Sequence, residues 1–174
     1  QTASSGKKLH LLGLVSDGGV HSHISHIDAL VKMAGQAGVS QICIHAFMDG
    51  RDTPPSSGRG FLAALEQRLQ QLGTGRIATV TGRYLAMDRD HRWDRVERAY
   101  RAMVEGIGTQ VGSAEAAVEQ AYAAGQTDEF VEPCIIGTPA TIDDGDGVIF
   151  FNFRADRARE ITRALTSVDF DGFE

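Results

Sequence analysis

The sequence predicts an α/β fold with a largely parallel sheet flanked by helices. Short apolar segments alternate with segments of helical periodicity, and polar loops containing glycine or proline separate the two. Because strand–helix alternation is typical of βαβ units, we expect parallel strands with helices on both faces of the sheet. The length of 174 residues allows one domain with a sizeable core and is too short for two.

The expected strands are short apolar runs that end in polar loops. They cover residues 9–15, 41–47, 77–81 and 148–153. The last of these runs is apolar enough to form a buried strand. Residues 131–136 and 140–142 are also apolar, and the intervening Gly137-Thr138-Pro139 favours a small hairpin. Residues 82–91 are highly charged, and we expect a loop there.

The expected helices have apolar residues at three- and four-residue spacing. They cover residues 22–37, 61–72, 113–124 and 156–165, and a further one starts near Asp94. Gly38 and Gly73 follow the first two helices as stop residues. Ser113 is the expected N-cap of its helix, and Glu97, three residues after Asp94, indicates a capping box.

Composition and charge exclude several classes of protein. The net charge of −6 argues against generic binding to nucleic acid or to an anionic membrane. No apolar run approaches the ~20 residues that a membrane-spanning helix needs. The two cysteines, Cys43 and Cys134, are too few for a disulfide scaffold, and Cys43 lies in an apolar run as a buried thiol would. A reducing cytoplasm suits this composition.

Polar side chains follow four of the expected strands, and many of them are arginines. Ligands of open α/β sheets bind at the carboxyl ends of the strands, where these loops meet. Clustered arginines need an anion, so we expect a small ligand with more than one anionic group. A GC-rich genome would also raise the arginine content. The loop residues are Ser16, Asp17, Gly18, Gly19, His21, His23, Asp49, Arg51, Asp52, Arg83, Asp88, Arg89, Asn152, Arg154, Asp156 and Arg157.

Two other functions remain open at this point. His21, His23 and His26 have a spacing that resembles metal ligands, which would suit a metal-dependent hydrolase, although no cysteine or carboxylate cluster of familiar zinc spacing accompanies them. A non-catalytic module that binds anions would use the same arginines. The acidic residues 143–147 lack the final glutamate of an EF-hand and are interpreted as a turn.

Four long motifs, in one register over about residues 9–170, resemble the cofactor-independent (2,3-bisphosphoglycerate-independent) phosphoglycerate mutases. The similarity is to the substrate-binding phosphotransferase domain of that family. The motifs are Leu14-Val15-Ser16-Asp17-Gly18-Gly19-Val20-His21-Ser22-His23, His45-Ala46-Phe47-Met48-Asp49-Gly50-Arg51-Asp52, Gly82-Arg83-Tyr84 with Met87-Asp88-Arg89-Asp90-His91-Arg92-Trp93-Asp94-Arg95, and Phe151-Asn152-Phe153-Arg154-Ala155-Asp156-Arg157-Ala158.

The resemblance implies a single inserted domain of a larger two-domain enzyme of glycolysis and gluconeogenesis. The other, phosphatase-like domain would supply a serine nucleophile and two Mn²⁺ ions, and the reaction would interconvert 3-phosphoglycerate and 2-phosphoglycerate through a phosphoserine. Residues 1–8 would then be a linker remnant, and residues 9–174 the transferase domain, incomplete at its C-terminus. No stretch here resembles the family's metal ligands or nucleophile, so we expect this chain alone to bind no metal and to be inactive.

The resemblance also assigns roles to individual residues. Asp52 is expected to accept the proton of the attacking hydroxyl, and Arg51 to orient it. Asp52, His21 and Arg154 are the expected catalytic residues. The substrate-binding residues are expected to be His21, Arg51, Asp52, Arg83, Arg89, Arg154 and Arg157.

The arginines divide between two anionic groups in this assignment. Arg83 and Arg89 are expected to hold the substrate carboxylate as bidentate forks. Arg154 and Arg157, together with His21, are expected to neutralise the travelling phosphoryl group, whose transition state spreads negative charge over its oxygens.

Overall fold

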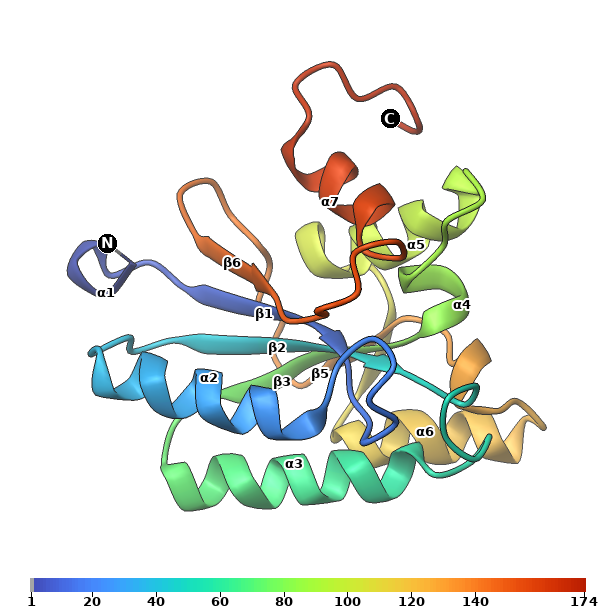
Figure 1. Cartoon of the computed structure of the whole chain (residues 1–174), viewed down its shortest axis with the longest axis horizontal. Helices are drawn as coiled ribbons and strands as arrows, with labels where there is room; N and C mark the ends of the chain where they lie inside the picture. The colour runs from blue at the N-terminus through green and yellow to red at the C-terminus, as the bar shows by residue number, and fades with distance from the viewer. Residues whose placement is uncertain (1) are drawn as a thin grey trace.

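A mixed six-stranded sheet of order β4-β5-β3-β2-β1-β6 forms the centre of the computed structural model, which describes residues 2–174 (Figure 1). Strands β6, β1, β2 and β3 run parallel to one another, β5 is antiparallel to β3, and β4 is parallel to β5. The sheet is therefore largely parallel, as predicted. The strands are β1 (Leu9–Leu14), β2 (Ile42–Met48), β3 (Arg76–Gly82), β4 (Thr109–Val111), β5 (Cys134–Ile136) and β6 (Gly147–Phe150).

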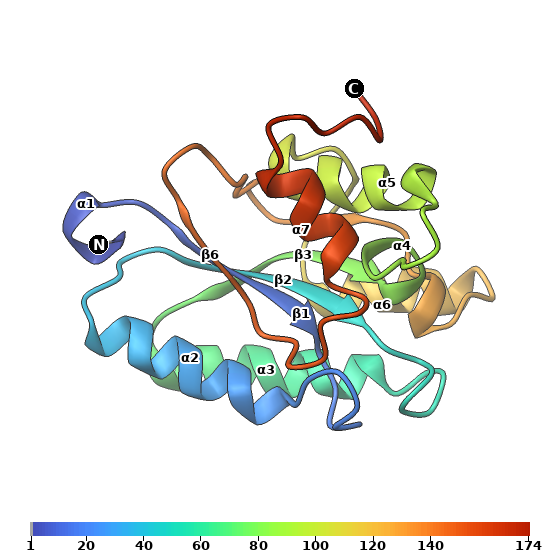
Figure 2. The ribbon, with the colours of Figure 1, turned by 45° about the horizontal axis from the view of Figure 1, so that its top comes forward.

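Helices cover both faces of the sheet. Figures 1 and 2 show α2 and α3 on one side and α5 and α7 on the other. In the part of the chain from residue 2 onward, no helix is long and apolar enough to cross a bilayer. The helices are α1 (Thr2–Ser5), α2 (Ile24–Gln36), α3 (Gly58–Leu72), α4 (Arg83–Ala86), α5 (Trp93–Val104), α6 (Ala114–Ala123) and α7 (Arg159–Thr166), with the 3₁₀ helix η1 (Asp128–Phe130).

The alternation of side chains along the central strands divides the core into two clusters. Leu11 and Ile44 point toward α2 and α3, whereas Leu12 and Phe47 point toward α5 and α7. Every residue of β1 and β2 is buried, because these strands have neighbours on both sides and helices on both faces. Their carboxyl ends are consequently rigid supports for the loops that follow.

Several predicted helix ends are confirmed. Gly73 ends α3 in the left-handed conformation with φ 65°, and Gly38, with φ 82°, follows the C-cap of α2. Ser113 caps α6 by accepting a hydrogen bond from the backbone N–H of Ala116. The capping box predicted at Asp94 is wrong, because α5 begins at Trp93 and its first turn receives no side-chain cap.

The hairpin predicted over residues 131–142 is also wrong. Residues 140–142 form no strand, and β5 instead pairs with β3 and β4, of which β4 was not predicted. The reason is that β5 finds its partners through long-range contacts, which local apolarity does not encode. Residues 82–91, predicted as a loop, contain the one-turn helix α4.

Strand β6 is not the buried strand that was predicted for residues 148–153. It lies at the edge of the sheet and leaves Val148 and Ile149 43% and 38% exposed. Its pairing stops after Phe150, where the side-chain oxygen of Asn152 accepts a hydrogen bond from the Leu14 backbone N–H at 3.0 Å. This side chain replaces a backbone acceptor, so the chain can turn away from the sheet toward the loop that precedes α7.

Helix α3 is capped from a distant part of the chain. Its N-cap residue, Ser57, makes no side-chain cap bond, and the carboxylate of Asp128 instead accepts from the backbone N–H of Gly58 at 2.8 Å. The Tyr122 hydroxyl donates to the same carboxylate at 2.5 Å. Burial, followed by the hydrogen bond to Asp128, raises the pKa of Tyr122. This contact joins α3 to α6 and η1, close to the loop that follows β2.

Near the amino ends of the strands, a buried row of polar side chains crosses the sheet. Thr79 Oγ1 lies 2.9 Å from His45 Nδ1, His45 Nε2 lies 2.9 Å from His10 Nδ1, and His10 Nε2 lies 3.2 Å from Asp146 Oδ2. Because the Asp146 carboxylate can only accept, the direction of every bond in this imidazole chain is set, with each neutral ring protonated at Nε2. The imidazole chain holds the loop before β6 against β1.

Candidate anion-binding active site

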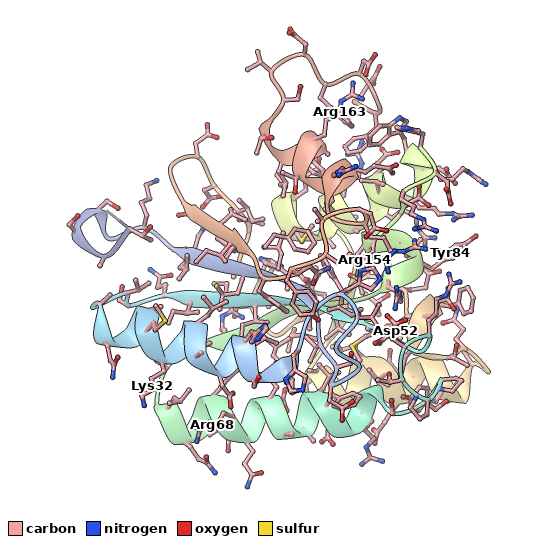
Figure 3. All side chains as sticks on the ribbon, viewed as in Figure 1. Lys32, Asp52, Arg68, Tyr84, Arg154 and Arg163 are labelled. Carbon is pink, nitrogen blue, oxygen red and sulfur yellow. The ribbon has the colours of Figure 1, made fainter. Side chains whose placement is uncertain are left out.

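The predicted site residues gather at the carboxyl edge of the parallel strands. They come from the loops that follow β1, β2, β3 and β6, as the strand directions require. Figure 3 labels Asp52 and Arg154 at this edge, whereas Lys32 and Arg68 project from α2 and α3. The sheet topology therefore brings together side chains that are more than a hundred residues apart in sequence.

Asp49, at the end of β2, is the acceptor around which the site is organised. Its side chain is 1% exposed and accepts hydrogen bonds from Ser16 Oγ at 2.7 Å and Arg83 Nη1 at 2.6 Å. The backbone N–H groups of Asp52 and Arg51 donate to it at 3.0 and 3.2 Å. Burial opposes ionisation of Asp49, but these hydrogen bonds outweigh it and lower the pKa. A charged Asp49 thus orders the loop after β2.

Arg83, the first residue of α4, links Asp49 to Asp52. Only 4% of its side chain is exposed, and Nη1 donates to both carboxylates at 2.6 Å. Both hydrogens of Nη1 are used in this way, so a ligand would meet the Nε and Nη2 sides of the guanidinium. The preceding Gly82 has no space for a Cβ, which would contact the backbone of η1 and of Val131. This close approach positions the first turn of α4.

His21 lies between Asp52 and Asp156. Its ring is 2% exposed, with Nε2 3.9 Å from Asp52 Oδ2 and Nδ1 3.9 Å from Asp156 Oδ1. Burial, and then the charge of Arg83, lowers the pKa of His21, so the ring is neutral near pH 7. Its backbone oxygen accepts from the Phe153 N–H at 2.8 Å. Nδ1 has no hydrogen-bond partner within residues 2–174, although it is buried.

Two arginines from different loops converge on one carboxylate. Arg89 Nη1 donates to Asp156 Oδ2 at 2.9 Å, and Arg154 Nη2 donates to the same oxygen at 3.0 Å. Arg154 Nε lies 2.9 Å from Asp156 Oδ1. Burial raises the pKa of Asp156, but the hydrogen bond from Arg89 and the charge of Arg154 outweigh it and lower the pKa overall. Asp156 is therefore ionised between two cations.

Arg157 lies among other cations. Its Nη1 donates to the backbone oxygen of Met87 at 3.1 Å. Burial, followed by the charges of Arg89, Arg83 and Arg51, lowers the pKa of Arg157. This mutual repulsion is the electrostatic signature of a site for an anion, since a bound anion would relieve it.

The structure brings most of the predicted site residues into two connected groups. Asp52, Arg83 and His21 form one group, and Arg89 and Arg154, joined through Asp156, form the other. Arg51 lies at the margin, half-exposed, with Nη1 3.4 Å from Glu129 Oε1.

The sequence placed Asp49, Asp88 and Asp156 in the loops at this edge but assigned none of them a role in the site. Asp88 is buried and holds the loop after α4 by accepting from the Asp90 and Arg92 backbone N–H groups at 2.9 and 3.0 Å. Each of the three acidic residues stands one or two positions from a predicted arginine. Proximity to an arginine in the sequence was the available signal for a carboxylate in the site. It does not distinguish the carboxylates that the fold buries from those that it leaves exposed.

The histidine-based metal site is not formed. His23 caps α2 by accepting from the Ser25 N–H, and the ring of His26 packs edge-on against Phe153 with ring centroids 5.9 Å apart. Across residues 2–174, no three His, Cys, Asp or Glu side chains come together to hold a metal ion. The alternative of a hydrolase using His21, His23 and His26 is therefore wrong. The two Mn²⁺ ions that the resemblance implies were expected on the other domain, and the three histidines are not arranged as ligands for them.

Comparison with known proteins decides the family. Residues 1–174 match the family model described as BPG-independent PGAM N-terminus (iPGM_N). The chain belongs to this family. It is 69% identical over 175 residues to the 2,3-bisphosphoglycerate-independent phosphoglycerate mutase of Syntrophotalea carbinolica, covering 99% of this chain and 34% of that protein. The enzyme of the same name from Symbiobacterium thermophilum is 56% identical over 170 residues, covering 97% and 33%.

A solved structure supports the same family. The chain is similar to Leishmania mexicana phosphoglycerate mutase, studied in crystals at low cobalt concentration, with a TM-score of 0.94 and 38% sequence identity. The similarity covers 99% of this chain and 34% of that one. The resemblance stated from the four motifs is thus confirmed, as is the α/β fold class. The chain spans about a third of the length of the curated relatives that it matches.

Proposed function

We propose that this chain is the substrate-binding part of a cofactor-independent phosphoglycerate mutase. In this proposal the whole enzyme interconverts 3-phosphoglycerate and 2-phosphoglycerate through a phosphoserine, as a cytoplasmic step of glycolysis and gluconeogenesis. The observation that carries the proposal is the cluster of Arg83, Arg89, Arg154 and Arg157 at one sheet edge of a protein with net charge −6. Membership of the iPGM_N family makes phosphoglycerate the natural anion.

Asp52 is the general base in this proposal. Its carboxylate is held by Arg83 and is 20% exposed, so it is both oriented and accessible to a substrate hydroxyl. The neutral ring of His21 lies beside it and can donate a hydrogen bond to a phosphoryl oxygen without adding a second full charge. When the glycerate hydroxyl attacks the phosphoserine, its proton passes to Asp52 and its oxygen forms a bond to phosphorus. The bond between phosphorus and the serine oxygen breaks, and the serine is released as the leaving group.

The arginines bind and orient the substrate. Arg83 and Arg89 hold the carboxylate, and Arg154 and Arg157 neutralise the phosphoryl oxygens, while Arg51 orients Asp52 from the margin of the site. The rest of the enzyme, a phosphatase-like domain, supplies the serine and two Mn²⁺ ions that would polarise the phosphoryl group. Residues 9–174 belong to the transferase domain, and residues 1–8 to a linker. This chain alone is expected to be inactive.

The test is a calorimetric titration of the chain with 3-phosphoglycerate at two salt concentrations. Arg154→Ala is compared with Arg68→Ala, because each arginine is half-exposed, 46% and 45%, and pairs with one aspartate. We expect saturable binding that salt weakens, a loss of at least about tenfold in Arg154→Ala, and no change in Arg68→Ala. Equal effects of the two substitutions would reject the proposed site.

The activity assay separates the enzyme from a non-catalytic anion-binding module. The full-length protein should interconvert the two phosphoglycerates with added Mn²⁺, and it should lose that activity in an Asp52→Asn variant. Anion binding without turnover by the full-length protein would favour the non-catalytic module. Turnover by the 174-residue chain alone would show that our expectation of an inactive chain is wrong.

A further inference from the structure

The carboxylate of Asp156 lies where three potential anion-binding groups meet. Arg89 and Arg154 donate to it at 2.9 and 3.0 Å, and the buried Nδ1 of His21 faces it at 3.9 Å, too far for a hydrogen bond. His21 Nδ1 has no hydrogen-bond partner in the described chain, although its ring is 2% exposed. A polar atom buried in this way indicates a place for another acceptor. Asp156 Oδ1, which faces Nδ1 and is likewise buried without a hydrogen-bond partner in the described chain, lies too far away to fill that place, whereas a ligand oxygen could.

Asp156 is held differently from the other carboxylates of the site. Asp49 is fixed by two backbone N–H groups and by Ser16, whereas the hydrogen bonds to the Asp156 carboxylate within residues 2–174 come from the two arginine side chains. Asp156 belongs to the turn between β6 and α7, and its side chain is 28% exposed. Its arginine partners are 45% and 46% exposed. These contacts can therefore open without disturbing the core.

We propose that Asp156 is an internal competitor that occupies the arginine site when no ligand is bound and is displaced by the anionic group of the substrate. The inference rests on the proposed function, because it assumes that Arg89 and Arg154 bind substrate. In the empty state, the carboxylate neutralises the two arginines and keeps them close together. When the substrate binds, Arg89 turns to its carboxylate, Arg154 and His21 turn to its phosphoryl group, and Asp156 rotates toward solvent.

Competition of this kind has a defined thermodynamic consequence. The apparent dissociation constant equals the intrinsic constant divided by the fraction of molecules in which the arginines are free. The apparent affinity of every anion that needs both arginines is therefore lowered by the same factor, whatever the intrinsic affinity of that anion. The two half-exposed ion pairs of Asp156, with Arg89 and Arg154, each shift the equilibrium toward the occupied state a few-fold, so together they make this factor roughly tenfold. A benefit to the enzyme would be faster release of a tightly held product.

The experiment is calorimetric titration of the 174-residue chain with inorganic phosphate and with 3-phosphoglycerate. Asp156→Asn keeps the size of the side chain and removes its charge, and Asp156→Ala removes the competing group altogether. Asp28→Asn is the matched control, because Asp28 is 39% exposed and pairs with Arg68 far from the site. We expect both Asp156 variants to bind 3-phosphoglycerate, which needs both arginines, about tenfold more tightly, and inorganic phosphate, which needs Arg154 but not Arg89, about threefold more tightly. The control should bind both ligands as the wild type does.

Each other outcome overturns the inference in a recognisable way. Weaker binding by both Asp156 variants, with unchanged melting temperature, would mean that Asp156 positions the arginines for the ligand. Unchanged affinity in both variants, or a gain equalled by Asp28→Asn, would mean that the carboxylate does not compete at this site. In these cases the proposed function stands, because the wild type still binds. Failure of wild type and variants alike to bind either anion would overturn the proposed function together with this inference.

Discussion

Replacing Asp49 and Asp52 separately by asparagine should separate the stability of the site from its chemistry. Asp49→Asn preserves shape, and its amide oxygen can still accept from the two backbone N–H groups, while Ser16 reorients to accept from the new amide. What is lost is the negative charge opposite the buried Arg83. Removing one partner of a buried charge pair costs about 3–5 kcal/mol, but Asp52 remains bonded to Arg83, so we expect about 2 kcal/mol.

Asp52→Asn removes a carboxylate that is 20% exposed and leaves the Asp49–Arg83 pair intact. Water can compensate for part of that loss, so we expect a cost below about 1 kcal/mol. In the full-length protein, where we propose that Asp52 acts as the general base, this substitution should lower the turnover rate by about a hundredfold or more. Asp49→Asn should lower it less than Asp52→Asn does.

Urea denaturation followed by circular dichroism measures the stability difference. For a chain of this length, a change of 2 kcal/mol corresponds to a fall in melting temperature of about 4–8 °C. The reasoning would be refuted if Asp52→Asn destabilised the chain as much as Asp49→Asn does. That result would show that Arg83 depends mainly on Asp52 and that Asp49 is not the organising acceptor.

Three further predictions concern the scaffold. Gly82→Ala should destabilise the chain by more than about 3 kcal/mol, because the new methyl group would overlap the backbone of η1. In the control Gly60→Ala on α3, the methyl group would meet no atom of residues 2–174 within 4 Å apart from its own stretch of helix, and this change should stabilise the chain by about 0.5–1 kcal/mol. The two variants are compared by their midpoints of urea denaturation. Burial, and then the neighbouring imidazole, holds the pKa of His45 well below its usual value, so unfolding takes up a proton and stability should fall as pH drops below about 6.5. The fall between pH 7.5 and 5.5 should be smaller in His45→Gln, and an equal fall would contradict the role of this ring. Tyr122→Phe should lower the free energy of unfolding by about 1 kcal/mol, because the hydrogen bond from the Tyr122 hydroxyl to Asp128 is lost. A melting temperature equal to that of the wild type would show that Asp128 caps α3 equally well without this bond.

The sequence could predict features that depend on local pattern. Apolar runs located β1, β2 and β3, and helical spacing located the long helices, because burial of a strand or of one helix face requires those periods. Gly73 and Ser113 marked helix ends because the left-handed conformation and the N-cap bond each need particular residue types. The order of the loops then placed Asp52 and Arg83 at one edge of the sheet.

Contacts between distant residues could not be predicted in the same way. The strand β5 pairs with β3 and β4 instead of forming a hairpin, since many apolar segments can pair and only the complete sheet selects among them. The same holds for the cap that Asp128 places on α3 from 70 residues away. The edge position of β6 also depended on the sheet order and not on the apolarity of its residues.

The sequence by itself determined the α/β class, the family and the residues that can carry charge at the site, because periodicity and four contiguous motifs are properties of the chain alone. Only the tertiary structure decided which carboxylate serves which arginine. Asp49, Asp52 and Asp156 are the same type of residue, and the sequence alone does not distinguish their environments. They differ because the fold buries Asp49 against backbone N–H groups, leaves Asp52 partly exposed and sets Asp156 between two half-exposed arginines. The energy of a charge depends on these surroundings.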